Sequence, residues 1–180
     1  MKIFVSGGAK NGKSSFAQNT VKRMAGSGPL YYIATMEPHD GEDDERIRRH
    51  VADRAGMGFQ TVECPRNILD CLSSVDTNAA FLLDSVTALL SNEMFPPPLY
   101  ETDVLAGERV ALELIELSRR VRDIVFVSDF IYSDAALFSE TTEQYRRALA
   151  HVDRMLAAEC DGVAELFAAN VIWHKGGAPE

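Results

Sequence analysis

The sequence predicts an α/β fold in which a mostly parallel central sheet is flanked by helices. Strand-like and helix-like segments alternate along its 180 residues, as they do in chains built from βαβ units. Two apolar runs, 79–83 and 124–127, have the continuous hydrophobicity of strands that are buried on both faces. A glycine-rich turn separates the first expected strand from the first expected helix. The length suits a single domain over residues 1–180.

The amino-terminal half supplies the first three strands. Residues 2–6 form the first strand, and the helix expected over 14–25 ends at a Gly-Ser-Gly-Pro segment. Residues 30–34, Leu-Tyr-Tyr-Ile-Ala, have the aromatic and apolar character of a strand. In the helix expected over 42–55, acidic residues precede basic ones, which complements the helix dipole. A short strand over 58–63 and a helix over 67–72 follow.

The carboxy-terminal half continues the alternation. The buried strand 79–83 leads to a helix over 87–94, after which three consecutive prolines interrupt the chain. Apolar residues recur at helical spacing over 102–122, and 124–127 is the next buried strand. A long amphipathic helix is expected over 140–159, and the runs 163–167 and 171–173 are expected to form a terminal hairpin.

Composition excludes several classes of function. The net charge of −9 argues against a nucleic-acid partner, because phosphate backbones are bound by basic surfaces. The apolar runs are far shorter than the roughly 20 residues of a membrane-spanning helix, and no signal peptide precedes the first strand. Three cysteines without a CxxC pair are typical of reduced thiols. We therefore expect a cytoplasmic protein without a membrane span.

The clearest motif is a complete phosphate-binding loop of the form GxxxxGK[ST]. Its glycines allow successive backbone N–H groups to face one anion, and the helix that follows adds its positive amino terminus. The lysine would reach the β- and γ-phosphates of a nucleotide, and the serine hydroxyl would bind Mg²⁺. Because a strand precedes the motif and a helix follows it, the motif predicts a P-loop enzyme. The loop consists of Gly7, Gly8, Ala9, Lys10, Asn11, Gly12, Lys13 and Ser14.

Two aspartates follow the buried strands and could serve the metal ion. P-loop enzymes usually hold Mg²⁺ with an acid at the end of a second buried strand. Asp84 follows Phe-Leu-Leu directly, and Asp129 follows Val-Phe-Val-Ser. Each could instead cap the next turn or helix. We favour Asp84, together with Ser14, for the metal or nucleotide role, and leave Asp129 open between the two interpretations.

The charged segment 42–55 places a histidine between two arginines. Arg46, His50 and Arg54 are spaced four residues apart and share one helix face. Such a histidine could be a nucleophile, with the arginines holding phosphate oxygens. From the spacing alone, a solvated charged helix with an incidental histidine is the more frequent case.

Several segments together form a more specific pattern. They are the opening 3–14, Tyr32-Ile-Ala-Thr35, Arg46-Ile-x-x-His50-x-x-x-Arg54, Thr61-Val-Glu63, and Leu82-Leu-Asp84-Ser-Val-Thr87 with Asn92 downstream. This pattern resembles the bifunctional adenosylcobinamide kinase / adenosylcobinamide-phosphate guanylyltransferase family of cobalamin biosynthesis. The detailed resemblance covers roughly the first half of the chain.

The resemblance implies a RecA-like P-loop NTPase fold and a kinase and nucleotidyltransferase that uses GTP, ATP and Mg²⁺. It also implies a corrinoid substrate and a homo-oligomer, a trimer. His50 would take GMP covalently, and Lys13 would act on the transferred phosphates. The nucleotide site that the resemblance implies comprises residues 7–14, Ala34, Thr35, Met36, Val51, Ala52, Asp53, Arg54, Glu63 and Asp84.

The segment after strand 124–127 departs from this family. The family usually reads Asn-Glu-Val-Gly there, whereas this chain reads Asp129-Phe-Ile-Tyr132. Three alternatives to the bifunctional enzyme stay open, the first of them because of this departure. They are a guanylyltransferase without kinase activity, a P-loop kinase of another small molecule, and a non-catalytic nucleotide-sensing module.

Overall fold

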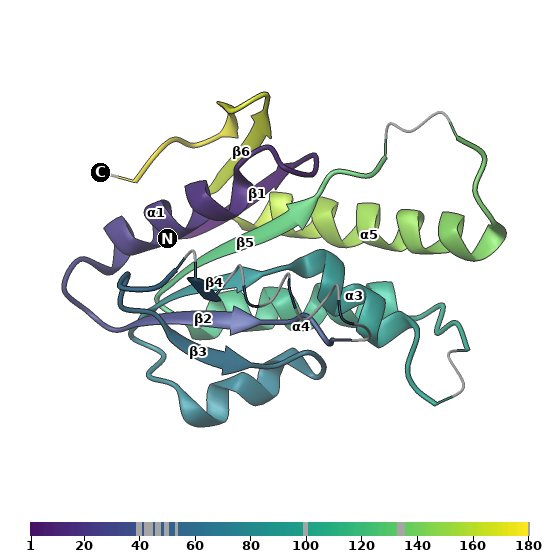
Figure 1. Ribbon diagram of the computed structural model, residues 1–180, viewed down its shortest axis with the longest axis horizontal. Coiled ribbons are helices and arrows are strands. Elements are labelled where there is room, and N and C mark those ends of the chain that lie inside the picture. The colour runs from purple at the N-terminus through teal and green to yellow at the C-terminus, as the bar shows by residue number, and fades with distance from the viewer. Residues whose placement is uncertain are drawn as a thin grey trace.

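The computed structural model describes residues 1–38, 41, 45, 48, 51, 52, 54–98, 101–132 and 136–179. Within these residues, seven strands form one sheet in the order β3-β2-β4-β5-β1-β6-β7 (Figure 1). The strands are β1 (Lys2–Gly7), β2 (Leu30–Ala34), β3 (Gln60–Glu63), β4 (Ala80–Asp84), β5 (Asp123–Asp129), β6 (Gly162–Phe167) and β7 (Asn170–Lys175).

The first six strands are parallel, and β7 pairs with β6 in the antiparallel direction. The expected terminal hairpin and the mostly parallel sheet are therefore both present. The register aligns the carboxyl ends of the strands: Gly7 lies opposite Asp129, and Ala34 lies opposite both Asp84 and Glu63. In open α/β sheets this edge is where ligands bind.

The helices divide between the two faces of the sheet. Helix α1 (Lys13–Ala25) packs on one face, against apolar residues of alternate positions such as Ile3, Val5 and Leu82. The intervening positions, such as Phe4 and Phe81, face the second core. That core is covered by η1 (Ile68–Ser74), α3 (Val86–Met94), α4 (Ala106–Arg120) and α5 (Glu140–Glu159). Burial on both faces explains why β4 and β5 are continuously apolar.

The charged segment expected over 42–55 is described at a few positions. Gly41, Glu45, Arg48, Val51 and Ala52 have helical backbone, and a turn follows from Arg54. His50, Arg46 and Asp53 lie outside the described residues.

Two other segments differ from the expectation. Helix α4 begins at Ala106 rather than near residue 102, because the Asp103 carboxylate accepts a hydrogen bond from the Leu105 N–H in a preceding turn. The helix expected over 67–72 is the 3₁₀ helix η1, which follows Asn67 in a left-handed conformation (φ 46°). Apolar spacing marks the buried side of such a short helix but does not distinguish 3₁₀ from α geometry.

Candidate nucleotide-binding site

The phosphate-binding loop joins β1 to α1 at the carboxyl edge of the sheet. Gly7 is required by packing, because a Cβ at this position would lie 2.4 Å from the carbonyl oxygen of Leu166 on β6. Gly12 has a φ of 84°, and Lys10 also adopts a left-handed backbone, with a φ of 59°. The loop therefore turns tightly before α1. Glycine suits position 12, because residues with a side chain rarely adopt this backbone conformation.

Lys13 is the first residue of α1 and is almost completely buried, with 7% of its side chain exposed. Its Nζ donates a hydrogen bond to the Gly8 carbonyl oxygen at 2.8 Å and lies 2.9 Å from Oδ1 of Asp129. The ion pair joins the P-loop to the end of the neighbouring strand β5. The ammonium group thus has an anionic partner at the place where a P-loop lysine meets phosphate oxygens.

A cavity of about 900 Å³ opens at this edge and is lined by the loop and by the ends of several strands. Its size is within the range of small-molecule and cofactor sites. Strands β1 and β3 at its two sides are four strand spacings apart in the sheet order, roughly 19 Å. The cavity is therefore wide enough for a nucleotide that extends from the loop toward β3.

Many of the sequence-predicted residues meet in this cavity. From the loop, Ala9, Lys10, Asn11, Gly12, Lys13 and Ser14 line it, and from elsewhere Ala34, Met36, Val51, Arg54, Glu63 and Asp84 do so. Gly7, Gly8, Thr35 and Ala52 are not among its lining residues, and His50 and Asp53 lie outside the described part of the chain.

Arg54 and Tyr32 form one wall of the cavity. The Arg54 guanidinium lies over the Tyr32 ring, 4.0 Å from its centroid, and its Nη2 donates to Oγ1 of Thr61 at 3.3 Å. The Tyr32 hydroxyl donates a hydrogen bond to Oδ2 of Asp84 at 3.0 Å. Tyr32 and Thr61 were part of the family-like segments but were not predicted as site residues. Alternation along β2 places Tyr32 on the same side as Ala34, and this was the available signal.

Thr35 supports the wall from behind. Its side chain is fully buried, and its hydroxyl donates to the Ser85 carbonyl at 2.7 Å while accepting from the Ser85 N–H at 2.8 Å. These two bonds fix the chain immediately after Asp84. Thr35 therefore acts on the cavity through the position of the Asp84–Ser85 segment.

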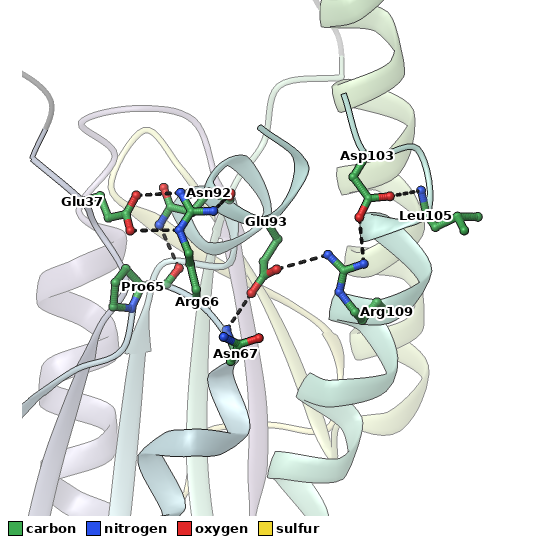
Figure 2. A network of polar contacts seen from close by, with 9 residues as sticks. All are labelled: Glu37, Pro65, Arg66, Asn67, Asn92, Glu93, Asp103, Leu105 and Arg109. Carbon is green, nitrogen blue, oxygen red and sulfur yellow. Dashed lines mark hydrogen bonds and ion pairs between the residues drawn. The ribbon is translucent and has the colours of Figure 1, made fainter. Parts of the chain in front are cut away.

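A network of polar contacts extends this support across the ends of β2, β3 and α3 (Figure 2). Arg66 forms a two-pronged ion pair with Glu37, at 3.0 Å and 2.8 Å, and also donates to the carbonyl oxygen of Asn92. The Asn92 amide donates to the carbonyls of Thr35 and Pro65 at 2.8 Å and 2.9 Å. Asn92 thereby ties three segments together at the back of the cavity.

The network continues to α4 through Glu93. One oxygen of Glu93 accepts a hydrogen bond from the Asn67 N–H at 2.6 Å, and the other is paired with Arg109 at 3.1 Å. Arg109 also pairs with Asp103 at 2.8 Å, and its hydrogen bond holds the pKa of Asp103 below its ordinary value. Thr35 and Asn92 were singled out from the sequence, whereas the ion-paired residues of this network were not, because their partners are distant along the chain.

A second polar cluster lies beside the P-loop, between β5 and α5. Asp153 is 7% exposed, and its Oδ2 accepts hydrogen bonds from Tyr132 at 2.6 Å and Ser128 at 3.0 Å. Its Oδ1 is buried without a partner among the described residues. Burial raises the pKa of Asp153 to about 7, although both hydrogen bonds act in the opposite direction. The divergent segment after β5 is thus anchored to α5 by Tyr132.

The residues at the loop suit a magnesium ion. Ser14 at the end of the loop and Asp84 at the end of β4 both line the cavity, and hydroxyl and carboxylate oxygens are ligands that Mg²⁺ prefers. Asp129 lines the same cavity but is paired with Lys13.

Comparison with known proteins gives a consistent match. A family model described as cobinamide kinase / cobinamide phosphate guanyltransferase matches residues 3–171. The bifunctional adenosylcobalamin biosynthesis protein CobU of Salmonella typhimurium is 29% identical over 177 residues, which cover 91% of this chain and 93% of that protein. The corresponding protein CobP of Pseudomonas aeruginosa is 30% identical over 168 residues, with 91% of each chain covered.

Solved structures support the fold. One solved ATPase domain superposes with a TM-score of 0.54 at 12% identity, over 99% of this chain and 78% of that one. The P4 protein from bacteriophage phi6, solved with ADP, gives a TM-score of 0.52 at 13% identity, over 99% and 58% of the two chains. These likenesses confirm the predicted P-loop NTPase fold. In the described part of the chain, no helix is long and apolar enough to cross a membrane.

Proposed function

The chain belongs to the cobinamide kinase / cobinamide phosphate guanyltransferase family, and we propose that it catalyses both reactions that this name describes. It phosphorylates adenosylcobinamide, and it transfers GMP from GTP to adenosylcobinamide phosphate, in cobalamin biosynthesis. The observation that carries this proposal is the shared cavity. The phosphate-binding loop and the strand-end residues Ala34, Arg54, Glu63 and Asp84 line one space of nucleotide size.

In the kinase reaction, a nucleoside triphosphate binds with its phosphates on the loop. The hydroxyl oxygen of the corrinoid's aminopropanol group attacks the γ-phosphorus, and the bond between the γ-phosphorus and the bridging oxygen breaks. The nucleoside diphosphate leaves, and the hydroxyl proton is released to solvent. Lys13 and the loop N–H groups stabilise the charge on the transferred group, because they are positioned before the reaction starts. A magnesium ion held by Ser14 and Asp84 would supply further positive charge at the phosphates.

In the transferase reaction, His50 is the nucleophile. A ring nitrogen of neutral His50 attacks the α-phosphorus of GTP, and pyrophosphate leaves. A phosphate oxygen of adenosylcobinamide phosphate then attacks the same phosphorus, and the bond to the histidine breaks. The covalent intermediate divides one difficult displacement into two easier ones. The positions of Val51 and Arg54, which follow His50 in the chain and line the cavity, support this assignment.

The test is to incubate the protein with α-³²P-GTP and Mg²⁺ and to separate it on a denaturing gel. We expect an acid-labile, base-stable label on the wild type that is absent from His50→Ala. His174→Ala is the matched control: this histidine is exposed on β7 and bonded to Glu165, so its loss should leave the label intact. A label that persists in His50→Ala would remove that residue from the mechanism.

The kinase reaction needs its own assay, because the segment after β5 departs from the family. Transfer of the γ-phosphate from ATP or GTP to adenosylcobinamide should be measured separately from GMP transfer. Activity in both assays is the expected result. GMP transfer without phosphorylation would identify a guanylyltransferase that has lost the first reaction. The cytoplasmic location and the trimeric assembly expected from the sequence belong to the same proposal, and sedimentation of the purified protein tests the trimer.

A further inference from the structure

The P-loop lysine already holds an anion in this structure. Lys13 Nζ contacts Oδ1 of Asp129 at 2.9 Å, and 7% of the lysine side chain is exposed. The Asp129 carboxylate and the phosphate oxygens of a bound nucleotide would compete for the same Lys13 ammonium group. A triphosphate on the loop must therefore share Lys13 with Asp129 or displace it.

Asp129 is held in place by its backbone. Its N–H donates a hydrogen bond to Oγ1 of Thr87 at 2.9 Å, and the next N–H, that of Phe130, donates to the Gly7 carbonyl at 2.9 Å. The pairing of β5 with β1 sets Asp129 directly opposite Gly7, at the start of the loop. The backbone of Asp129 therefore keeps its carboxylate within reach of the phosphate site when Lys13 turns to a ligand.

The charges around Asp129 do not favour a bare polyanion. The described lining of the cavity carries four acidic side chains, Glu37, Glu63, Asp84 and Asp129, against three basic ones, Lys10, Lys13 and Arg54. The buried Asp153 also lies near Asp129, whose charge contributes to raising the Asp153 pKa. A triphosphate that takes Lys13 from Asp129 leaves an unpaired carboxylate beside its own negative charge, which is unfavourable in a partly buried site. A divalent cation on the phosphates reverses the sign of this interaction.

We propose that Asp129 occupies the phosphate position on Lys13 in the absence of nucleotide, and that its displacement makes triphosphate binding depend on a divalent cation. Asp129 is in this sense a specificity-determining residue, which selects the metal-bound nucleotide over the free one. The inference rests on the proposed function as far as nucleotide binding is concerned. It adds a role that separates Asp129 from Asp84.

The experiment measures GTP affinity by calorimetry for the wild type and Asp129→Asn, each with Mg²⁺ and with EDTA. Asparagine keeps the shape and removes the charge. We expect GTP affinity in EDTA to rise by about tenfold or more in the variant, because one like charge next to the phosphates is gone. The affinity with Mg²⁺ should change much less, so that the ratio of the two affinities falls.

Asp84→Asn is the matched control, because this aspartate ends the next strand and lines the same cavity. It should weaken binding with Mg²⁺, which Asp129→Asn keeps, because it removes a carboxylate that would hold the ion. Asp129→Ala serves if the asparagine variant does not fold. An unchanged ratio in folded Asp129 variants would overturn the inference while leaving nucleotide binding intact. Failure of the wild type to bind either GTP or ATP with Mg²⁺ would overturn both this inference and the proposed function.

Discussion

The acidic side chains on the two sides of the cavity have partners of different kinds. On the β2–β3–β4 side, carboxylates meet guanidinium groups: Glu37 is paired with Arg66, and Glu93 and Asp103 are paired with Arg109 (Figure 2). On the β5–α5 side, Asp153 is buried against two hydroxyl groups, and one of its oxygens has no partner within the described residues.

The pKa values follow the same division. A hydrogen bond from Arg109 lowers the pKa of Asp103, whereas burial raises that of Asp153 to about 7. The first side is a frame of paired charges that fixes the cavity wall, since each carboxylate named here has a guanidinium partner. The second side keeps excess negative charge next to Lys13, where binding of a nucleotide and a cation can rearrange it. The paired charges on the first side thus fix the cavity wall, whereas the charges on the second side can change partners when a ligand binds.

The largest effect should come from removing the ammonium group of Lys13, on the β5–α5 side. Lys13→Ala should lower the turnover of phosphoryl transfer by roughly 10² to 10³-fold, as expected when a preorganised charge is lost from the transition state. Lys10→Ala is the matched control, because this loop lysine is exposed and has no resolved ion pair in the described structure. Steady-state kinetics at saturating nucleotide would decide; similar losses for both lysines would contradict a special role for the buried one.

The next largest effect concerns Asn92, in the network at the back of the cavity. Asn92→Ala should destabilise the protein by about 2 to 3 kcal/mol, because the Thr35 and Pro65 carbonyls both lose a buried donor. Urea unfolding measures this directly. Asn170→Ala, which removes an exposed asparagine on β7, should stay within about 0.5 kcal/mol of the wild type. A loss of less than about 0.5 kcal/mol at Asn92 would show that this network is not needed for stability.

The smallest effect is the pH dependence contributed by Asp153. Its folded-state pKa of about 7 lies above the ordinary value of 3.8, so the folded protein binds a proton more tightly than the unfolded chain. Stability from this group should therefore fall as the pH rises from about 4 to about 7, and level off above that. Between about pH 5.5 and about pH 8, the expected loss is roughly 2 kcal/mol.

Asp153→Asn should remove this slope, and unfolding in urea at both pH values would show it. The asparagine can still bond to Ser128 and Tyr132, because hydroxyl groups both donate and accept. At about pH 8 the variant should be at least as stable as the wild type. A variant that keeps the wild-type slope would mean that another group titrates in this range.

Much of the site could be predicted from local patterns. The GxxxxGK[ST] motif between a strand and a helix indicated the loop, and the apolar runs that end near Asp84 and Asp129 indicated the carboxyl edge of the sheet. The family resemblance added Ala34, Met36, Val51, Arg54 and Glu63, which line the same cavity as the loop. The role assigned to His50 stays a prediction.

The sequence by itself determined the fold class and the family, because strand and helix periodicity and the spacing of the loop glycines are local properties of the chain. The tertiary structure decided which groups meet. The sheet order places β5 directly beside β1 and β4 one strand further away. Lys13 therefore pairs with Asp129, at the end of β5, and not with Asp84, at the end of β4. It also brings Arg66 to Asn92 and Asp153 to Tyr132. Such pairs depend on contacts between distant segments, and these exist only once burial of the two cores has packed the helices onto the sheet.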